Sequence, residues 1–320
     1  ISNYFNNCIW QLFRNAEFHL FPILIATMKK LGRYIASLLL ISILSLYGLD
    51  YIFTKSYYDG VPRTKISWVQ SQSFPDSLDY VLLGSSRCIN HLQPELITKT
   101  TNKKGLNLGY ASSGPVEIKL MLYEVIRNSN VKKVFIQVDY IFNQTQPDVL
   151  AIVGWLPFIK EKKVYSELIK YDNKYRLFKF IPFYRYQLFD PKIGVRNVSL
   201  IYLGKQGDFI SSKGYIPINR TMKKGTVFNK AINDKENKIF NEIIEICLKN
   251  DIELHFFTSP IYNNRSDFGT LNKYLPNFKD FSNSISERNL FSDATHLNHQ
   301  GASLFTEIFI ETYFKQTKSQ

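Results

Sequence analysis

The chain carries a serine, an aspartate and a histidine whose surroundings suit nucleophilic catalysis. Ser86 ends a Gly-Ser-Ser turn that directly follows the apolar run Tyr80–Leu83. Asp293 and His296 stand three residues apart near the other end of the chain. A serine becomes a nucleophile when a base removes its proton, and a carboxylate keeps that base oriented. The sequence therefore predicts acyl transfer, with Ser86 as nucleophile, His296 as general base and acid, and Asp293 as the orienting carboxylate.

Alternating apolar and amphipathic segments predict the elements that position these residues. The expected strands are 80–83, 106–108, 133–140, 252–258 and a short one at 289–291, and the expected helices begin near 94 and cover 116–127, 231–250 and 300–314. Strand–helix alternation of this kind predicts an α/β fold with a parallel sheet covered by helices. The carboxyl ends of parallel strands meet at one edge of a sheet. Ser86 and His296 can therefore come together although they are far apart in the sequence.

The rhythm is interrupted at about 141–228. This interval is rich in aromatic residues, lysine, proline and glycine, and only short helical pieces are expected in it, around 160–169. We interpret it as an insertion over the carboxyl edge of the sheet, serving as a lid or a substrate-binding surface. Its aromatic residues are expected mainly to pack, with stacking on a sugar as the alternative.

The amino-terminal part contains an apolar run suited to crossing a membrane. Residues 34–53 are almost wholly apolar and are preceded by Lys29, Lys30 and Arg33. About 20 apolar residues span a bilayer as a helix, and basic flanks stay on the cytoplasmic side. We predict a single-pass anchor in a bacterial cytoplasmic membrane, with the domain after it extracytoplasmic. No small-x-small cleavage pattern follows, which favours an anchor over a cleaved signal peptide; a buried core helix is the other alternative.

The remaining boundaries follow from this anchor. Residues 1–33 form an amino-terminal extension and basic leader, 54–78 a linker, and 79–320 the α/β domain. The start-like sequence Met28-Lys29-Lys30 favours a native protein that begins at Met28, which would make 1–27 an upstream extension.

Composition excludes several classes of protein. The chain has 320 residues, of which 45% are apolar, so it can bury a sizeable core. Its three cysteines, Cys8, Cys88 and Cys247, have neither metal-binding nor disulfide spacing. The net charge of +13 comes from lysines spread along the chain, which favours a solvated surface over attraction to anionic lipids or an acidic glycan. Without a basic helix or an RNA-recognition signature, nucleic acid is not an expected partner. No metal or organic cofactor is expected.

The motifs together resemble a known family. Gly84-Ser85-Ser86, Asn107-Leu108-Gly109 with Gly114 downstream, and Asp293-Ala-Thr-His296-Leu-Asn resemble the blocks of the SGNH/GDSL hydrolase superfamily. The closest resemblance is to its membrane-anchored branch, which includes alginate O-acetyltransferase-like proteins and the teichoic-acid D-alanylation protein. The resemblance runs from Asp79 to Phe314 but does not cover the insertion. It implies a three-layer, flavodoxin-like parallel sheet with helices on both faces.

The resemblance also assigns roles to individual residues. Ser86 takes the place of the nucleophile, with Ser85 where the family usually has an aspartate. Asp293 and His296 take the places of the family's aspartate and histidine. Gly114, or less favourably Gly109, is implied as the backbone donor to the oxyanion.

The third block departs from the family pattern. Where the family usually has Gly-x-Asn-Asp, this chain has Gln137-Val-Asp139-Tyr-Ile-Phe-Asn143. Asn143 is one candidate for the missing oxyanion donor; the alternative is that Asp139 serves another purpose. Loss of one such donor typically costs about 10²–10³ in rate. The departure therefore bears on the expected catalytic rate more than on the expected fold.

Two further side chains near Ser86 are candidate substrate contacts. Arg87 would suit an anionic group, although a structural ion pair fits its position equally well. His91 is the second candidate, with packing as its alternative. His255, inside an expected strand, is predicted to be structural, and His299 is predicted to be exposed on the last helix.

These observations favour a serine-dependent acyl-ester hydrolase or O-acetyltransferase acting on a cell-envelope glycan. The resemblance implies that a transferase would receive its acyl group from a separate membrane-bound acyl-donor protein. Two alternatives stay open. One is a non-catalytic envelope protein that keeps the fold and binds a glycan or a partner protein. The other is a free-standing lipase or carboxylesterase, which would need a wide apolar pocket.

Overall fold

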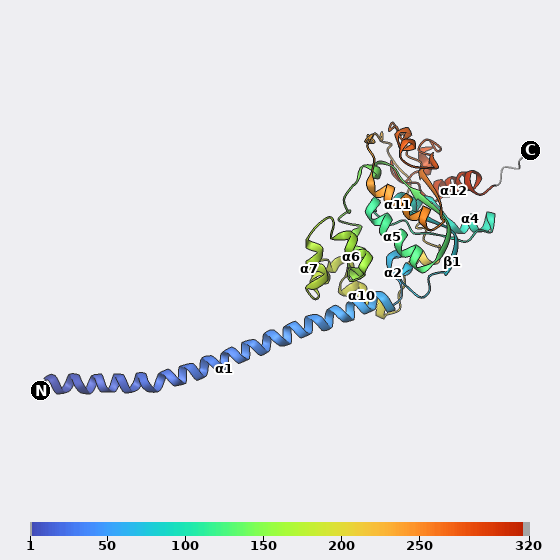
Figure 1. The fold of residues 1–320 in the computed structure, drawn as a ribbon. Coiled ribbons are helices and arrows are strands. Elements are labelled where there is room, and N and C mark those ends of the chain that lie inside the picture. The colour runs from blue at the N-terminus through green and yellow to red at the C-terminus, as the bar shows by residue number, and fades with distance from the viewer. Residues whose placement is uncertain (1, 316–320) are drawn as a thin grey trace, which may run out of the picture. The chain divides into compact units, whose positions relative to one another are not determined.

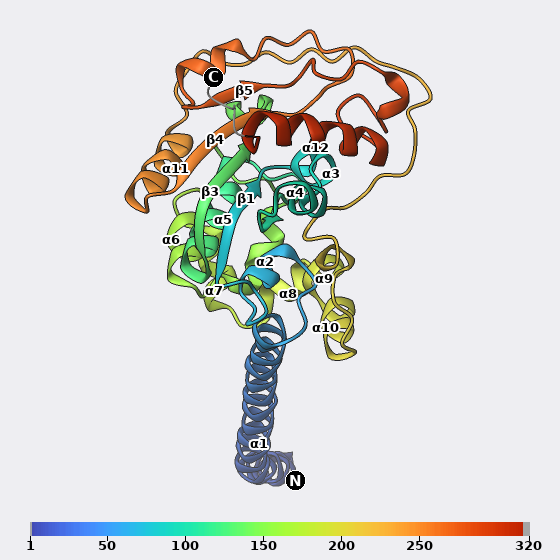
Figure 2. The ribbon, with the colours of Figure 1, turned by 90° about the vertical axis from the view of Figure 1, so that its right-hand side faces the viewer.

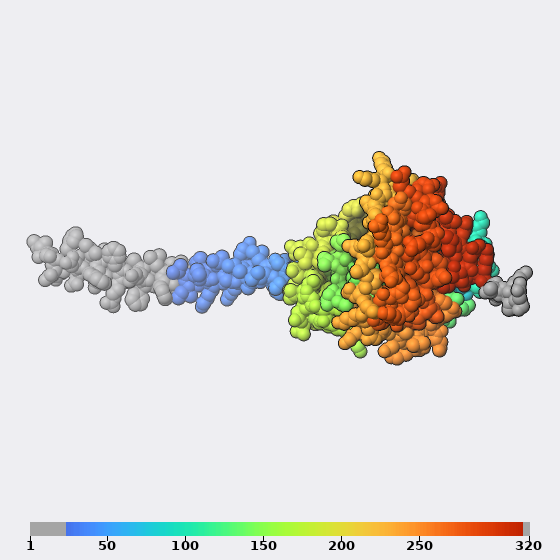
Figure 3. All heavy atoms as spheres, turned by 90° about the horizontal axis from the view of Figure 1, so that it is seen from above, coloured from blue at the N-terminus to red at the C-terminus, as the bar shows by residue number. Residues whose placement is uncertain are grey.

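A computed structural model describes the backbone of residues 2–315 and the side chains of residues 24–315. The chain divides into two compact units, Ile1–Ile52 and Phe53–Gln320. The second unit holds every strand and every residue of the candidate site (Figure 1). In a space-filling view, segments from the carboxyl-terminal half of the chain, coloured orange to red, form most of one face of this unit (Figure 3).

The second unit is built on a five-stranded parallel sheet, which confirms the predicted α/β class. The strands are β1 (Ser77–Leu83), β2 (Gly105–Asn107), β3 (Asn130–Gln137), β4 (Glu253–Thr258) and β5 (Phe278–Asp280). Their order is β2-β1-β3-β4-β5, and every neighbouring pair is parallel. In a sheet with this order, successive strands are added first on one side of β1 and then on the other, so the strand order reverses between β1 and β3. Ligands bind at the carboxyl ends of the strands at this switch point. Ser86 follows β1 at this switch point.

Successive residues of the central strands face two different hydrophobic clusters, because side chains alternate along a strand. On β1, Val81 and Leu83 belong to one cluster, and Tyr80 and Leu82 belong to the other. The first cluster includes apolar residues of α2 (Lys65–Val69), α5 (Pro115–Asn128) and α11 (Lys238–Lys249). The second includes residues of α3 (Ser86–His91), α4 (Pro94–Thr101) and α12 (His299–Tyr313) (Figure 2). Both faces of the sheet are therefore buried, which accounts for the unbroken apolar runs of its central strands.

The predicted elements differ from the observed ones at several places. The strand expected at 289–291 is instead the 3₁₀ turn η5 (Arg288–Leu290), and only an isolated bridge joins Phe291 to Leu297. The last strand is β5, which has no buried residue and so no apolar signal. The helix expected over 231–250 begins only at Lys238, because the side chain of Asn237 accepts a hydrogen bond from the amide of Ile239 and caps the helix there.

The insertion consists of helices that are too short to present a long apolar face. They are η1 (Tyr140–Asn143), η2 (Ile152–Phe158), α6 (Lys162–Leu168), α7 (Lys174–Phe180), α8 (Tyr184–Leu188), α9 (Asp190–Ile193), α10 (Val195–Tyr202) and η3 (Asp208–Ile210); η4 (Gly269–Lys273) lies later in the chain. Helix α6 falls within the interval 160–169 where a short helical piece was predicted.

The amino-terminal helix α1 runs over Ser2–Asp59. Its part Leu24–Asp59 is long and apolar enough to cross a membrane, with a mean hydropathy of 1.9 over its best window. The proposed start at Met28 and the upstream extension 1–27 stay predictions, and the side chains of residues 1–23 lie outside the described part of the chain. Residues 54–78, predicted as a linker, instead contain the end of α1 and the buried helix α2.

Helix α2 carries a lysine buried in the core. Thr64 caps this helix by accepting a hydrogen bond from the amide of Ser67. Lys65 is only 3% exposed, and its Nζ has no hydrogen-bond partner among the described residues. Burial lowers the pKa of Lys65 to about 7. The charged amine is therefore a source of instability in the folded chain.

We expect the free energy of unfolding to rise between about pH 7 and the usual lysine pKa near 10.5. Below that window both states bind the proton, and the full cost of burying the charge is present. Within it the unfolded chain still binds the proton while the folded chain does not, so stability rises with pH, by about 5 kcal/mol in total. Lys65→Met should be more stable than the wild type at pH 7 and should lose this rise.

The measurement is urea unfolding of the full chain in detergent at pH 7 and pH 10, followed by fluorescence of the buried Trp68 and Trp155. The matched control is Lys249→Met, because the Lys249 side chain is 76% exposed. A Lys65→Met variant with the same pH dependence as this control would contradict the assignment.

Candidate active site

Ser86 stands at the first position of α3, directly after β1. The turn between them depends on Gly84, whose φ is +147° and whose added Cβ would lie 2.8 Å from the Cβ of Gln137. Ser85 then caps α3, because its hydroxyl accepts a hydrogen bond from the amide of Arg87. The same hydroxyl donates to Oε1 of Gln137 at 2.7 Å. These contacts fix Ser86 at the carboxyl edge of the sheet.

The structure brings Ser86, His296 and Asp293 into one hydrogen-bonded chain. Oγ of Ser86 lies 2.8 Å from Nε2 of His296. Nδ1 of His296 lies 2.9 Å and 3.1 Å from the two carboxylate oxygens of Asp293. With its proton on Nδ1 and donated to Asp293, His296 presents Nε2 as the acceptor for the Ser86 proton. The Ser86 and His296 side chains are half-buried, so a small substrate can reach them.

A tight loop between η5 and α12 presents the histidine. Oδ1 of Asp293 accepts the backbone amides of Thr295 at 2.9 Å and of His296 at 3.0 Å. The amide of Ser292 donates to the carbonyl of His296 at 2.8 Å, which closes the loop. Asn298 then caps α12 by accepting from the amide of Gly301. The spacing Asp-x-x-His is therefore the spacing of a turn in which one carboxylate holds both the backbone and the ring.

The charge of Asp293 is stabilised by its neighbours. Partial burial alone would raise its pKa, but hydrogen bonds from His296 and Thr295 outweigh that effect and hold the pKa well below the usual range. Arg220 donates to Oδ2 of Asp293 at 3.2 Å while its side chain stays 70% exposed. Arg220 belongs to the insertion, and no motif in the sequence singled it out.

Arg87 faces the protein interior, which corrects the prediction that it contacts a substrate and leaves its alternative, a structural ion pair. Its side chain is 2% exposed and forms a buried ion pair with Asp139, whose side chain is 1% exposed. The guanidinium also donates to the carbonyls of Ser259 and Pro260. Gln137 donates to the same Asp139 carboxylate at 2.9 Å. Arg87 and Asp139 thus tie the carboxyl ends of β1, β3 and β4 together, and Arg87 is not exposed to a substrate.

His91 is also inaccessible to a substrate, which corrects the second prediction. It is fully buried, and its Nε2 accepts the amide of Leu297 at 3.0 Å. Its ring lies edge-on to that of His296, with centroids 6.2 Å apart. Burial lowers the pKa of His91, and the charges of Arg87 and His296 lower it further. Neutral His91 therefore packs against the loop that carries His296 and accepts a hydrogen bond from it.

The two predicted oxyanion donors are engaged elsewhere. The amide of Gly114 donates to Oε2 of Glu117 at 2.9 Å at the start of α5. The side chain of Asn143 donates to the carbonyl of Ala231 and accepts the amide of Asn233, both at 2.9 Å. The single N–H of Gly114 cannot hydrogen-bond an oxyanion at Ser86 without giving up Glu117, which corrects that assignment. The amide nitrogen of Asn143 has a second hydrogen that these contacts do not use, so the Asn143 assignment stays a prediction.

Two other backbone amides are candidates for the oxyanion donor. The amide of Gly109, the less favoured candidate, donates to Oδ1 of Asn107 at 3.2 Å. The amide of Ser86 itself is the first of α3, and amides at this position have no acceptor within their own helix. Within the described residues it has no other acceptor. The amide of Ser86 is therefore the backbone donor best placed for an oxyanion formed on Ser86.

Comparison with protein-family models and with curated proteins found no match to this chain. Within residues 24–315, no three histidine, cysteine, aspartate or glutamate side chains come together in a way that could hold a metal ion. The carboxyl edge of the parallel sheet carries, at its switch point, a serine, a histidine and an aspartate that are linked by hydrogen bonds in that order.

Proposed function

We propose that the chain is a serine-dependent acyl-ester hydrolase or O-acyltransferase. One observation carries the proposal: Ser86 Oγ lies 2.8 Å from His296 Nε2 while His296 Nδ1 lies 2.9 Å from Asp293. Nucleophile, base and orienting carboxylate in this arrangement suit attack on an ester carbonyl. Their place at the reversal point of a parallel sheet, where ligands bind, supports the same reading.

The proposed reaction proceeds in two halves. Oγ of Ser86 attacks the ester carbonyl while Nε2 of His296 accepts its proton. Asp293 stabilises the resulting imidazolium, and the amide of Ser86 donates to the oxyanion. His296 then gives its proton to the departing alkoxide, which leaves an acyl group on Ser86. In the second half, water or an acceptor hydroxyl attacks the acyl carbon while His296 takes its proton. The bond from the acyl carbon to Oγ of Ser86 then breaks, and His296 returns the proton to Oγ.

The acyl group, substrate and location that we propose rest on the resemblance of the motifs to the SGNH/GDSL superfamily. The resemblance to the SGNH family, with Ser86, Asp293 and His296 in the family's order, supports an SGNH-type three-layer fold and an acetyl or similar small acyl group as the one transferred. A helix able to cross a membrane supports an anchored domain. The basic flank Lys29, Lys30 and Arg33 supports placing that domain outside the cytoplasm of a bacterium, where the substrate would be an acylated envelope glycan. For a transferase, a separate membrane protein would deliver the acyl group.

Covalent labelling tests the proposal. We expect the full chain in detergent to react with a fluorophosphonate serine probe, and Ser86→Ala and His296→Ala to remove this labelling, because the probe requires an activated serine. The matched control is His299→Ala, an exposed histidine next to the same loop that should label normally. If the folded wild-type chain does not react with the probe, the proposal is wrong.

A second candidate function is favoured by one specific observation. The amide of Gly114 and the side chain of Asn143 are both engaged in other hydrogen bonds. A fold with the triad but a weak oxyanion site suits a non-catalytic envelope protein that binds a glycan or a partner. Absent labelling together with glycan binding that depends on residues around Ser86 would favour this candidate.

A further inference from the structure

The insertion exposes an unusual number of apolar side chains over one stretch of short helices. Between residues 174 and 205, six large apolar residues are at least 45% exposed: Leu177, Phe180, Leu188, Val195, Tyr202 and Leu203. The inner faces of these helices are already packed, since Tyr175 and Phe178 of α7 and Val198 and Ile201 of α10 are buried. The outer face of a helix in a water-soluble domain is normally polar. Here the outer face of α7 exposes Leu177 and Phe180, and that of α10 exposes Val195 and Tyr202.

The same stretch is strongly basic. Residues 174–205 contain seven lysines and arginines but a single acidic residue, Asp190, for a net charge of +6. Six of the seven basic side chains lie on the surface rather than in the core: Lys174, Arg176, Lys179, Lys192, Arg196 and Lys205. Exposed apolar residues interleaved with lysine and arginine are typical of helices that lie in the interfacial plane of a membrane.

Two exposed aromatic residues on this stretch, Phe180 and Tyr202, add a second interfacial signature. The other six phenylalanines and tyrosines of 175–189 are buried or packed against the first hydrophobic cluster. Aromatic side chains are enriched where a protein meets the headgroup region of a bilayer, because their rings are apolar and their edges polar. We name the exposed surface of α7 to α10, residues 174–205, the basic apolar surface.

Chain connectivity places this surface next to the end of the apolar run. Phe53 is the last residue of the predicted span and the first residue of the second unit. Its ring packs against those of Phe183 and Tyr186, with centroids 4.9 Å and 5.3 Å away. Four residues later, Tyr57 donates to the carbonyl of Ile193 at 2.9 Å. The residues that first follow the run are therefore bound to α8 and α9 within the second unit (Figure 2).

We propose that the basic apolar surface lies in the headgroup region of a bilayer that contains anionic lipids. If residues 34–53 cross a membrane, chain continuity keeps Phe53, and the helices packed on it, within a few residues of the bilayer surface. The apolar side chains then enter the interface while the lysines and arginines reach the anionic headgroups. This contact would hold the domain at a fixed orientation on the membrane, independently of any chemistry at Ser86.

Spin-label accessibility in the full chain tests this proposal. With Cys8 replaced by serine, a nitroxide is attached through Leu203→Cys or through Leu248→Cys, a matched control on α11 that is equally exposed at 70%. The native Cys88 and Cys247 are buried. In nanodiscs of phosphatidylcholine and phosphatidylglycerol, the label at 203 should collide more with oxygen than with a water-soluble nickel complex. The label at 248 should show the opposite preference.

Charge reversal tests the anionic component. Arg196→Glu with Lys205→Glu should return the label at 203 to the aqueous pattern, whereas Lys238→Glu with Lys249→Glu, the same change in charge on α11, should not. An aqueous pattern at 203 in the unaltered chain would overturn the proposal and would point to a protein partner for this surface. Equal immersion in nanodiscs with and without phosphatidylglycerol would overturn the requirement for anionic lipid.

Discussion

His296→Ala is expected to lower kcat for hydrolysis of a chromogenic acetyl ester by a factor on the order of 10⁶, and Ser86→Ala should lower it equally. Oγ of Ser86 lies 2.8 Å from Nε2 of His296, and in the proposed mechanism one proton passes between them, so neither residue would act without the other. The double variant should therefore be no slower than either single variant. The measurement is steady-state turnover by the full chain in detergent, with each variant prepared in parallel.

Asp293→Asn separates orientation from proton transfer. An asparagine keeps the shape of the loop but cannot accept the Nδ1–H of His296 as a carboxylate does, so a loss on the order of 10⁴ is expected. His299→Ala, on the first turn of α12, should leave turnover unchanged.

Losses that multiply in the Ser86→Ala, His296→Ala double variant would show that the two residues act independently, which contradicts a shared catalytic unit.

The central strands of the sheet could be predicted from sequence because they are buried on both faces. Tyr80–Leu83 and Val134–Ile136 read as unbroken apolar runs, and both lie in the middle of the sheet. β5 has exposed or half-buried residues only, so its three positions gave no apolar signal. The start of α11 was missed because the segment before Lys238 keeps an apolar spacing without forming a helix.

The triad could be predicted because its parts are local. Asp293 and His296 share one turn, and Ser86 directly follows a strand. The partners of Arg87, His91 and Gly114 could not be predicted, since each depends on which elements lie side by side. Arg87 meets Asp139 only because β1 and β3 are neighbours, and His91 meets Leu297 only because α3 packs on α12. Pairings between distant segments leave no periodicity in the sequence.

Arg87→Met alone is expected to lower the free energy of unfolding by about 3–5 kcal/mol, and Asp139→Leu alone by a similar amount. Each change leaves the partner's charge buried without its counter-charge, since both side chains are at most 2% exposed. The double variant should recover much of the loss, because two apolar side chains of similar volume bury no charge. The measurement is urea unfolding of the full chain in detergent, followed by the buried Trp68 and Trp155.

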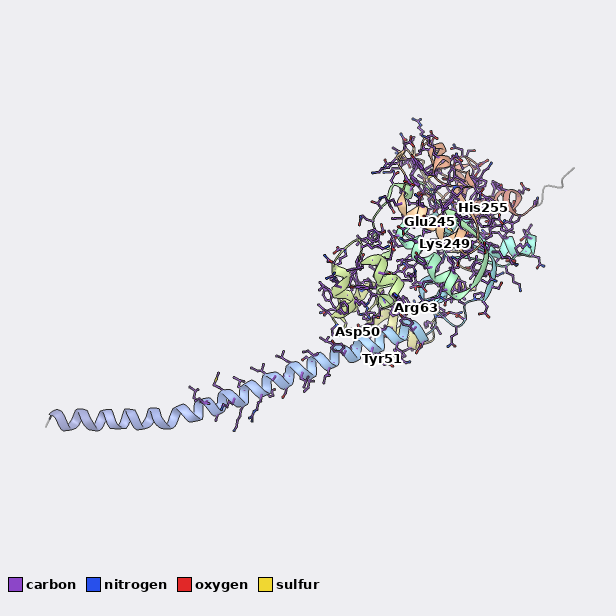
Figure 4. The ribbon with its side chains drawn as sticks, in the orientation of Figure 1. Asp50, Tyr51, Arg63, Glu245, Lys249 and His255 are labelled. Atoms are coloured by element: carbon purple, nitrogen blue, oxygen red, sulfur yellow. The ribbon has the colours of Figure 1, made fainter. Side chains whose placement is uncertain are left out.

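The matched control is the ion pair between Glu245 and Lys249 on α11, labelled in Figure 4. Its atoms lie 3.7 Å apart, and its side chains are 65% and 76% exposed, so solvent screens the attraction. Removing Lys249 should cost less than about 1 kcal/mol. If Arg87→Met were equally mild, the pair with Asp139 would not be what joins β1 to β3 beneath Ser86. A large loss in both single variants with recovery in the double would instead assign Asp139 a structural role at the position where the family pattern differs.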